Sequence, residues 1–177
     1  MGSFFSNISF KKNNISKDKL IEFVNQSSSL NGISAKYLMN IKEDNEWVTI
    51  YDPFEDSDND IYKLAQTLNK LLGTPIFIAQ CCDSDFMLLG IAVKNDIDIC
   101  SVGIPYEEEE KLIPDIQKWS ILFNTNDKKE KFLKIIDVDY VFSEESMEPL
   151  AEILGIKEEH INKTYDEALE ENDIIRI

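Results

Sequence analysis

Three apolar runs follow one another in the middle of the chain, separated only by short polar turns. They cover residues 75–82, 86–93 and 97–102. Runs of this length, rich in Val, Ile, Leu and Phe and bounded by Asp, Ser and Asn, predict β-strands. Strands joined by such short turns pair as antiparallel neighbours. The centre of the chain therefore predicts an antiparallel sheet, and its first run, apolar throughout, predicts a central strand.

The first third of the chain predicts two helices interleaved with further strands. Ser16 suits the N-cap of a helix that ends in the turn containing Gly32, and Gly73 suits the end of the second helix. The strands are expected over residues 3–10, 35–41 and 46–51, and the second helix over 59–72. The order strand, helix, strand, strand, helix, strand predicts an α+β fold built on a ferredoxin-like, split βαβ unit, extended by an extra hairpin.

The composition changes after Gly103, where a helical half begins. Helices are expected from about Pro114, over 128–136, over 144–154 and along the acidic tail 158–172, with a final edge strand over 174–177. The glutamate run 107–110 suits a helix start. No linker separates the two halves, so we expect one domain over residues 1–177, with sheet in 1–103 and helices packed on it in 104–177.

Charge is the strongest property of the whole composition. The 177 residues include 34 acidic and 18 basic side chains, for a formal net charge of −16. Such a field repels phosphate backbones and anionic lipid, and the single arginine, Arg176, leaves no cluster for reading phosphate. We therefore expect neither nucleic acid nor membrane as a partner. Two interpretations of the charge stay open: solubility alone, or a surface matched to a basic protein.

The cysteines indicate a reducing compartment. There are three, of which Cys81 and Cys82 are adjacent and Cys100 stands alone, so neither a disulfide framework nor a zinc motif is predicted. The first ten residues lack a basic n-region, and no apolar run is long enough to cross a membrane. We expect a cytoplasmic protein without a cofactor. The excess of Ile, Asn and Lys is typical of an AT-rich bacterial genome.

Four aspartates near the predicted strand ends are the candidates for metal binding. They are Asp83, Asp85, Asp96 and Asp98. Carboxylates at the ends of neighbouring strands hold two metal ions in nucleotidyltransferases and some glycosyltransferases. The first two aspartates and Ser84 equally suit a hairpin turn, because Asp and Ser bond to nearby backbone. A metal-dependent transferase is therefore the alternative function.

A second candidate site combines aromatic and acidic side chains around the turn after residue 51. It consists of Trp47, Tyr51, Phe54, Asp56, Asp58, Asp60 and Tyr62. The alternating aspartates do not form a calcium loop, because Ile61 and Thr67 occupy the positions that need Gly and Glu. Packing in the core explains the aromatic residues, but aromatics rimmed by carboxylates also suit a contact with a basic protein. We place the partner-binding site here.

The only histidine, His160, follows Lys157 and two glutamates, and we expect it to be exposed at a helix start. One histidine cannot build a multi-histidine metal site or a familiar serine triad, so hydrolase chemistry is disfavoured. Core packing is expected for the thiols of Cys81 and Cys82.

Several short motifs together resemble a group of small bacterial proteins. They are the stretch Trp-Val-Thr-Ile-Tyr-Asp at 47–52, Leu64-Ala65 with Leu68, the Asp-Ser-Asp turn, and Leu150-Ala151 with Leu154-Gly155-Ile156. The resemblance covers roughly residues 45–165 and brings no activity with it. The function expected from the sequence is a non-enzymatic, acidic protein-binding module of the immunity or inhibitor kind, with a basic partner such as a nuclease toxin.

Overall fold

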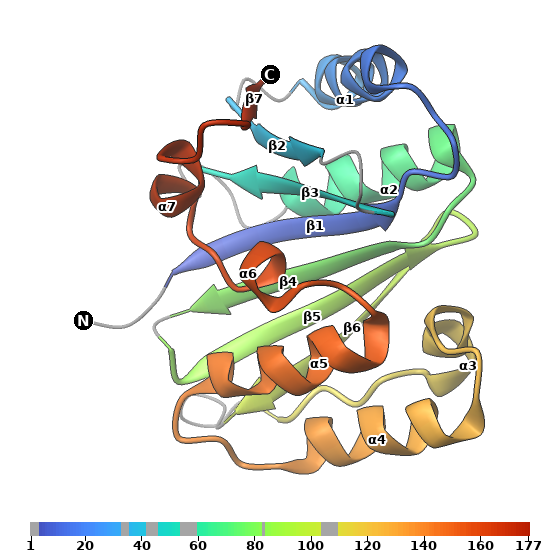
Figure 1. The fold of residues 1–177 in the computed structure, drawn as a ribbon. Helices are drawn as coiled ribbons and strands as arrows, with labels where there is room; N and C mark the ends of the chain where they lie inside the picture. The colour runs from blue at the N-terminus through green and yellow to red at the C-terminus, as the bar shows by residue number, and fades with distance from the viewer. Residues whose placement is uncertain (1–3, 33–35, 42–45, 54–59, 83, 104–109) are drawn as a thin grey trace.

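A computed structural model describes residues 4–32, 36–41, 46–53, 60–82, 84–103 and 110–177. Within these ranges, seven strands form one antiparallel sheet and seven α-helices accompany it, which confirms the predicted α+β class. Figure 1 shows helices on both sides of the sheet, so the molecule has three layers.

The bounds of the elements follow the predicted order closely. The strands are β1 (Phe5–Lys11), β2 (Leu38–Ile41), β3 (Trp47–Asp52), β4 (Ile76–Cys82), β5 (Phe86–Val93), β6 (Asp96–Gly103) and β7 (Ile175–Arg176). The helices are α1 (Lys17–Asn31), α2 (Asp60–Leu72), α3 (Ile116–Trp119), α4 (Asn126–Asp137), α5 (Met147–Leu154), α6 (Glu158–Ile161) and α7 (Tyr165–Leu169). Two 3₁₀ turns, η1 (Ser120–Leu122) and η2 (Ser143–Ser146), complete the helical part.

The sheet has the strand order β6-β5-β4-β1-β3-β2-β7, and every neighbouring pair is antiparallel. Strand β1 lies between β3 and β4, so the first strand of the chain is central in the sheet. The three apolar runs form the consecutive strands β4, β5 and β6, as predicted. Successive residues on a strand point to opposite faces, so each face has its own set of side chains.

Helices α1 and α2 cover one face of the sheet. Ser16 caps α1 by accepting a hydrogen bond from the Lys19 backbone N–H, and Gly32 ends the helix in the left-handed conformation. On α2, Ile61, Leu64, Ala65 and Leu68 are buried and form one stripe. These side chains pack in one core with Ile8, Val48, Ile50 and Ile78 of the sheet.

Helices α3, α4, α5 and α6 belong to the layer on the opposite face (Figure 1). The core there joins apolar side chains of β4, β5 and β6 with those of the helices. Trp119 is fully buried and stacks on Phe132 of α4, with ring centroids 4.7 Å apart. This second core anchors the helical half directly on the sheet.

The C-terminal half differs from its prediction in the lengths of its helices. The chain over residues 110–115 is not helical and runs beside β6, where the Ser101 backbone N–H donates to the Leu112 carbonyl. Pro114 therefore precedes a helix of only four residues, α3. The acidic tail forms two short helices, α6 and α7, rather than one, and β7 pairs with β2 as the expected edge strand. Of the glutamate run 107–110, residues 107–109 lie outside the described ranges.

Candidate functional site

The described metal-binding candidates, Asp85, Asp96 and Asp98, are divided between the two ends of the β5–β6 hairpin. Asp96 pairs with Val93, and Asp98 pairs with Ile91. Asp85 instead precedes the other end of β5, where Phe86 pairs with Gly103. Six strand positions separate it from the level of Asp98, which is about 20 Å. Asp83 lies outside the described residues. The three described aspartates are therefore not brought together.

Asp96 and Asp98 hold the segment that runs beside β6. Asp98 Oδ2 accepts hydrogen bonds from the indole N–H of Trp119, at 2.7 Å, and from the Asp115 backbone N–H, at 2.8 Å. Asp96 makes an ion pair with Lys118 at 2.7 Å, which lowers the pKa of the Asp96 carboxyl. Both carboxylates thus have structural partners on or next to α3.

The turn before β5 is held by η2. Ser84 has a positive φ of 61°, and its hydroxyl donates to Glu144 Oε1 at 2.9 Å. The Ser84 carbonyl also accepts from the Ser143 backbone N–H. Among the residues that the structure describes, no group of three or more His, Cys, Asp or Glu side chains could hold a metal ion. The contacts of Ser84 favour a structural turn over a metal site at this position.

Two aromatic residues of the predicted partner-binding site are internal, which corrects the prediction for these two residues. Trp47 and Tyr51 are buried, with exposed fractions of 5% and 0%. Tyr62 is half-buried, and its hydroxyl donates to Gln80 at 3.0 Å. Asp60 begins α2 and pairs with Lys63, while Phe54, Asp56 and Asp58 lie outside the described ranges. Trp47 and Tyr51 lie on the face of β3 opposite to Val48 and Ile50, and they are buried because the C-terminal half covers that face as well.

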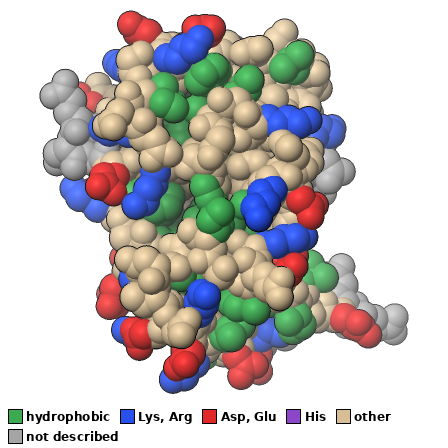
Figure 2. Space-filling view, turned by 90° about the vertical axis from the view of Figure 1, so that its right-hand side faces the viewer, with side chains coloured by type: hydrophobic (Ala, Val, Ile, Leu, Met, Phe, Trp, Pro, Cys, Tyr) green, Lys and Arg blue, Asp and Glu red, His purple; other side chains and the backbone are tan. Residues whose placement is uncertain are grey.

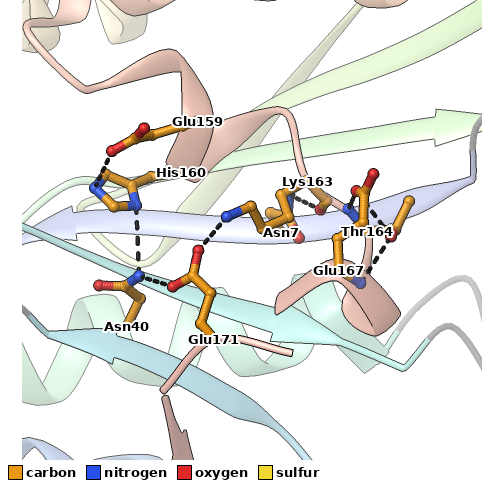
Figure 3. A network of polar contacts seen from close by, with 8 residues as sticks. All are labelled: Asn7, Asn40, Glu159, His160, Lys163, Thr164, Glu167 and Glu171. Atoms are coloured by element: carbon orange, nitrogen blue, oxygen red, sulfur yellow. Dashed lines mark hydrogen bonds and ion pairs between the residues drawn. The ribbon is translucent and has the colours of Figure 1, made fainter. Parts of the chain in front are cut away.

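A buried polar cluster connects the sheet to the end of the chain (Figure 3). Asn7 of β1 donates to the carbonyls of Ile161 and Lys163, at 3.1 and 2.9 Å. Asn40 of β2 donates to Glu171 at 2.9 Å, and Glu171 pairs in turn with Lys163. Since the bonds of Asn7 and Asn40 span more than a hundred residues of sequence, they fix the tail onto the sheet.

His160 belongs to this cluster, and the expectation that it is exposed was wrong. Only 1% of the residue is exposed. Its Nδ1 lies 3.5 Å from the Asn40 amide nitrogen, and its Nε2 lies 3.8 Å from Glu159 Oε1. The residue faces β2 because the four-residue helix α6 turns its side chain inward, toward the sheet. Sequence reasoning could have found the cluster from Asn7 and Ser9, polar residues among the apolar residues of β1.

Three further buried groups, Cys81, Cys100 and Tyr51, favour their neutral forms. Burial raises the pKa of the Cys81 thiol to about 11, and burial also raises the pKa of Cys100. Tyr51 lies under the tail, where burial and then Glu171 raise the pKa of its hydroxyl above the ordinary 10.0. None of these groups is prepared as a nucleophile, because each would have to ionise in the interior.

The most strongly charged surface of the described chain is its C-terminal part. Residues 137–173, here called the acidic layer, contain thirteen acidic residues against Lys157 and Lys163, which is −11 of the formal −16. Eleven of the carboxylate residues are exposed. Lys163 is already paired with Glu171. By contrast, the side of the molecule shown in Figure 2 carries lysines interspersed with carboxylates, so the charge is unevenly distributed.

Comparisons of the chain with protein-family models, with curated proteins and with solved structures gave no match. The described residues include no helix with the length and apolar character needed to cross a membrane.

Proposed function

We propose that the protein is a non-enzymatic, acidic protein-binding module whose partner is a basic protein. The observation that carries this proposal is the acidic layer, where eleven carboxylates are exposed beside one exposed lysine, Lys157. A surface of this kind steers a basic partner during encounter and disfavours acidic competitors. An immunity or inhibitor protein that masks a basic target, such as a nuclease toxin, needs a surface that attracts this target and disfavours acidic proteins.

The layer is suited to binding because it is held rigidly on the sheet. Asn7 and Asn40 of the sheet donate hydrogen bonds to the tail. The capping box of Thr164 and Glu167 orders the start of α7. Carboxylates on a rigid support lose little conformational entropy on binding. The proposal retains the expectations of a cytoplasmic location and of no nucleic-acid or membrane partner, since the same field repels phosphate and anionic lipid.

We also propose that the central part of the sheet is a ferredoxin-like unit. The consecutive order β4-β1-β3-β2, with α1 and α2 on the same face, supports this assignment. Strands β5 and β6 then extend the unit at one edge. The resemblance to small bacterial proteins stays a prediction beside this assignment.

The transferase alternative has less support. Its site combines Asp83 and Asp85 with Asp96 or Asp98, whereas the register separates Asp85 from Asp98 by about 20 Å and places Asp96 two strand positions farther away. Asp98 is already bonded to Trp119 and Asp115.

Affinity capture tests the proposed function. The immobilised protein is compared with Glu148→Gln/Glu152→Gln/Glu170→Gln, which removes three exposed carboxylates of the acidic layer. We expect the wild-type protein to retain a basic protein from a bacterial lysate at physiological salt, and the variant to retain much less of it. Mass spectrometry identifies what is retained.

A matched control removes three exposed carboxylates from the rest of the surface. Asp18→Asn/Glu22→Gln/Glu46→Gln changes the net charge by the same amount and should retain the partner as the wild type does. Equal losses in both variants would show unspecific charge attraction. Retention of neutral or acidic proteins only would contradict the proposed function.

A further inference from the structure

Exposed apolar side chains concentrate in two segments, one of which extends into the acidic layer at residue 137. Among the described residues, ten large apolar side chains are exposed, and six of them lie in two segments. These six are Leu112, Ile113, Leu133, Val138, Val141 and Phe142. Ile113 and Val141 are exposed to 74% and 71%, although isolated exposed apolar residues need no explanation. Six in neighbouring segments indicate an interaction surface.

A groove runs between residues 111–114 and helix α4. Its volume is about 320 Å³, and Ile113, Pro114, Leu133 and Ile136 supply its apolar lining. Its open rim includes Lys134 and Asp137. The groove could receive apolar side chains from a partner but would leave a small ligand largely in water, because Ile113 and Leu133 stand exposed beside it.

The groove continues into residues 137–145, here called the acidic segment. Lys111 at the groove pairs with Asp139 of this segment at 3.5 Å. In the acidic segment the exposed residues Val138, Val141 and Phe142 are interspersed with Asp137, Asp139, Glu144 and Glu145. An aromatic residue with carboxylates around it is the arrangement that the sequence led us to expect elsewhere, around Trp47.

The charges decide which occupant fits this surface. Lys111 and Asp139 neutralise each other, and Lys134 stands beside Asp137 on the groove rim. The acidic segment also contains Glu144 and Glu145 and no cation of its own, so its net charge remains negative when Lys111 and Lys134 are counted with it. A partner segment with apolar residues on one side and Lys or Arg on the other matches both features.

We propose that the groove and the acidic segment together form the docking surface for an amphipathic, basic segment of the partner protein. This inference rests on the proposed function and adds where the partner binds. Apolar side chains of the segment occupy the groove and contact Val141 and Phe142, while its cations face the carboxylates of the acidic segment. A second copy of this chain is a poor occupant, because both copies carry −16.

Two synthetic peptides test the proposal by fluorescence anisotropy. One is an amphipathic helix of leucine and lysine, and the other has serine in place of every leucine. We expect the wild-type protein to bind the first peptide at least about tenfold more tightly, because only that peptide has apolar anchors. Val141→Ser/Phe142→Ser should abolish this preference and leave the weak binding of the serine peptide unchanged.

A matched control removes exposed apolar side chains far from this surface. Phe4→Ser/Leu30→Ser changes residues exposed to 48% and 67% and should keep the full preference. If the first variant is poorly folded by circular dichroism, Ile113→Ser serves in its place, since 74% of that residue is exposed.

The outcomes separate this inference from the proposed function. If both peptides bind equally well, charge alone explains the binding. The proposed function is then retained, and the proposed docking surface is contradicted. If the preference survives in Val141→Ser/Phe142→Ser, the apolar contact lies elsewhere and the inference is overturned. If neither peptide binds, the proposed function itself fails. A concentration-dependent dimer that Val141→Ser/Phe142→Ser dissociates would make a second copy the occupant and also overturn the inference.

Discussion

The indole N–H of Trp119 donates a hydrogen bond of 2.7 Å to Asp98 Oδ2. Trp119 is fully buried and packs against Phe77 and Phe132, so this bond satisfies a donor that has left water. The same oxygen accepts from the Asp115 backbone. A carboxylate that sequence reasoning assigned to a metal thus fastens α3 to the edge strand of the sheet.

Replacing this carboxylate should therefore destabilise the protein. In Asp98→Ala, the Trp119 indole and the Asp115 N–H lose their acceptor, so the free energy of unfolding should fall by about 2 kcal/mol. Urea denaturation followed by tryptophan fluorescence measures the change. Asp96→Ala is the control, because Asp96 makes an exposed ion pair with Lys118 and accepts an exposed hydrogen bond from the Ile97 N–H, and their loss should leave the midpoint nearly unchanged. If both variants lost the same free energy of unfolding, the structural role of Asp98 would be contradicted.

Gly103 should tolerate no side chain. Its φ is +89°, and a Cβ atom there would lie 2.3 Å from the backbone oxygen of Asp85. Gly103→Ala should lower the free energy of unfolding by roughly 3 kcal/mol, the sum of strain and steric overlap. Gly73→Ala is the matched control, because Gly73 has a φ of +64° and open space around it, so only about 1 kcal/mol should be lost. Thermal unfolding of both variants distinguishes the two costs.

Asn7 should determine how firmly the C-terminal tail is held. Asn7→Ala removes two hydrogen bonds to the carbonyls of Ile161 and Lys163, at a cost of about 2 kcal/mol. We expect amide hydrogen exchange to accelerate first in α6, α7 and β7. Asn31→Ala, which removes one bond within α1, to Ser27, and one from α1 to Thr67 of α2, should leave exchange in the tail unchanged. Uniform acceleration in both variants would contradict a local role.

Two buried tyrosines should make the fold sensitive to alkali. Burial raises the pKa of both Tyr37 and Tyr51 above the ordinary 10.0. The unfolded chain therefore releases protons near pH 10 that the folded chain keeps, so stability is complete below pH 10 and falls as pH rises above it. Tyrosinate absorbance should show a late step that coincides with unfolding and disappears in Tyr37→Phe/Tyr51→Phe. If all tyrosines ionised near pH 10 while the protein remained folded, the prediction that Tyr37 and Tyr51 stay protonated until unfolding would be contradicted.

The strands were predicted well because their signals are local. The run 86–93 coincides with β5, the run 75–82 begins one residue before β4, and the run 97–102 falls one residue short of β6 at each end. Period-two alternation and turn residues contain this information without any knowledge of partners. The region after Gly103 was harder, because residues 110–115 extend along β6 through tertiary hydrogen bonds to Ser101 and Asp98.

The candidate site could not be located from sequence for a related reason. Trp47 and Phe142 are both aromatic residues close to carboxylates in sequence, but the first is 5% exposed and the second 51%. Whether such a residue lies in the core depends on which face of its element is covered by distant helices. The charge of residues 137–173 was visible in the sequence, and only the fold showed that most of these carboxylates are exposed.

The salt dependence of partner binding tests the central claim most directly. The dissociation constant of the captured basic protein is measured by calorimetry from low to physiological ionic strength, where the Debye length is about 8 Å. For the wild type, affinity should fall steeply with salt, and Glu148→Gln/Glu152→Gln/Glu170→Gln should reduce both the affinity and its slope. An affinity that does not change with salt concentration would contradict the acidic layer as the binding face. The same holds if the variant shows the same salt dependence of affinity as the wild type.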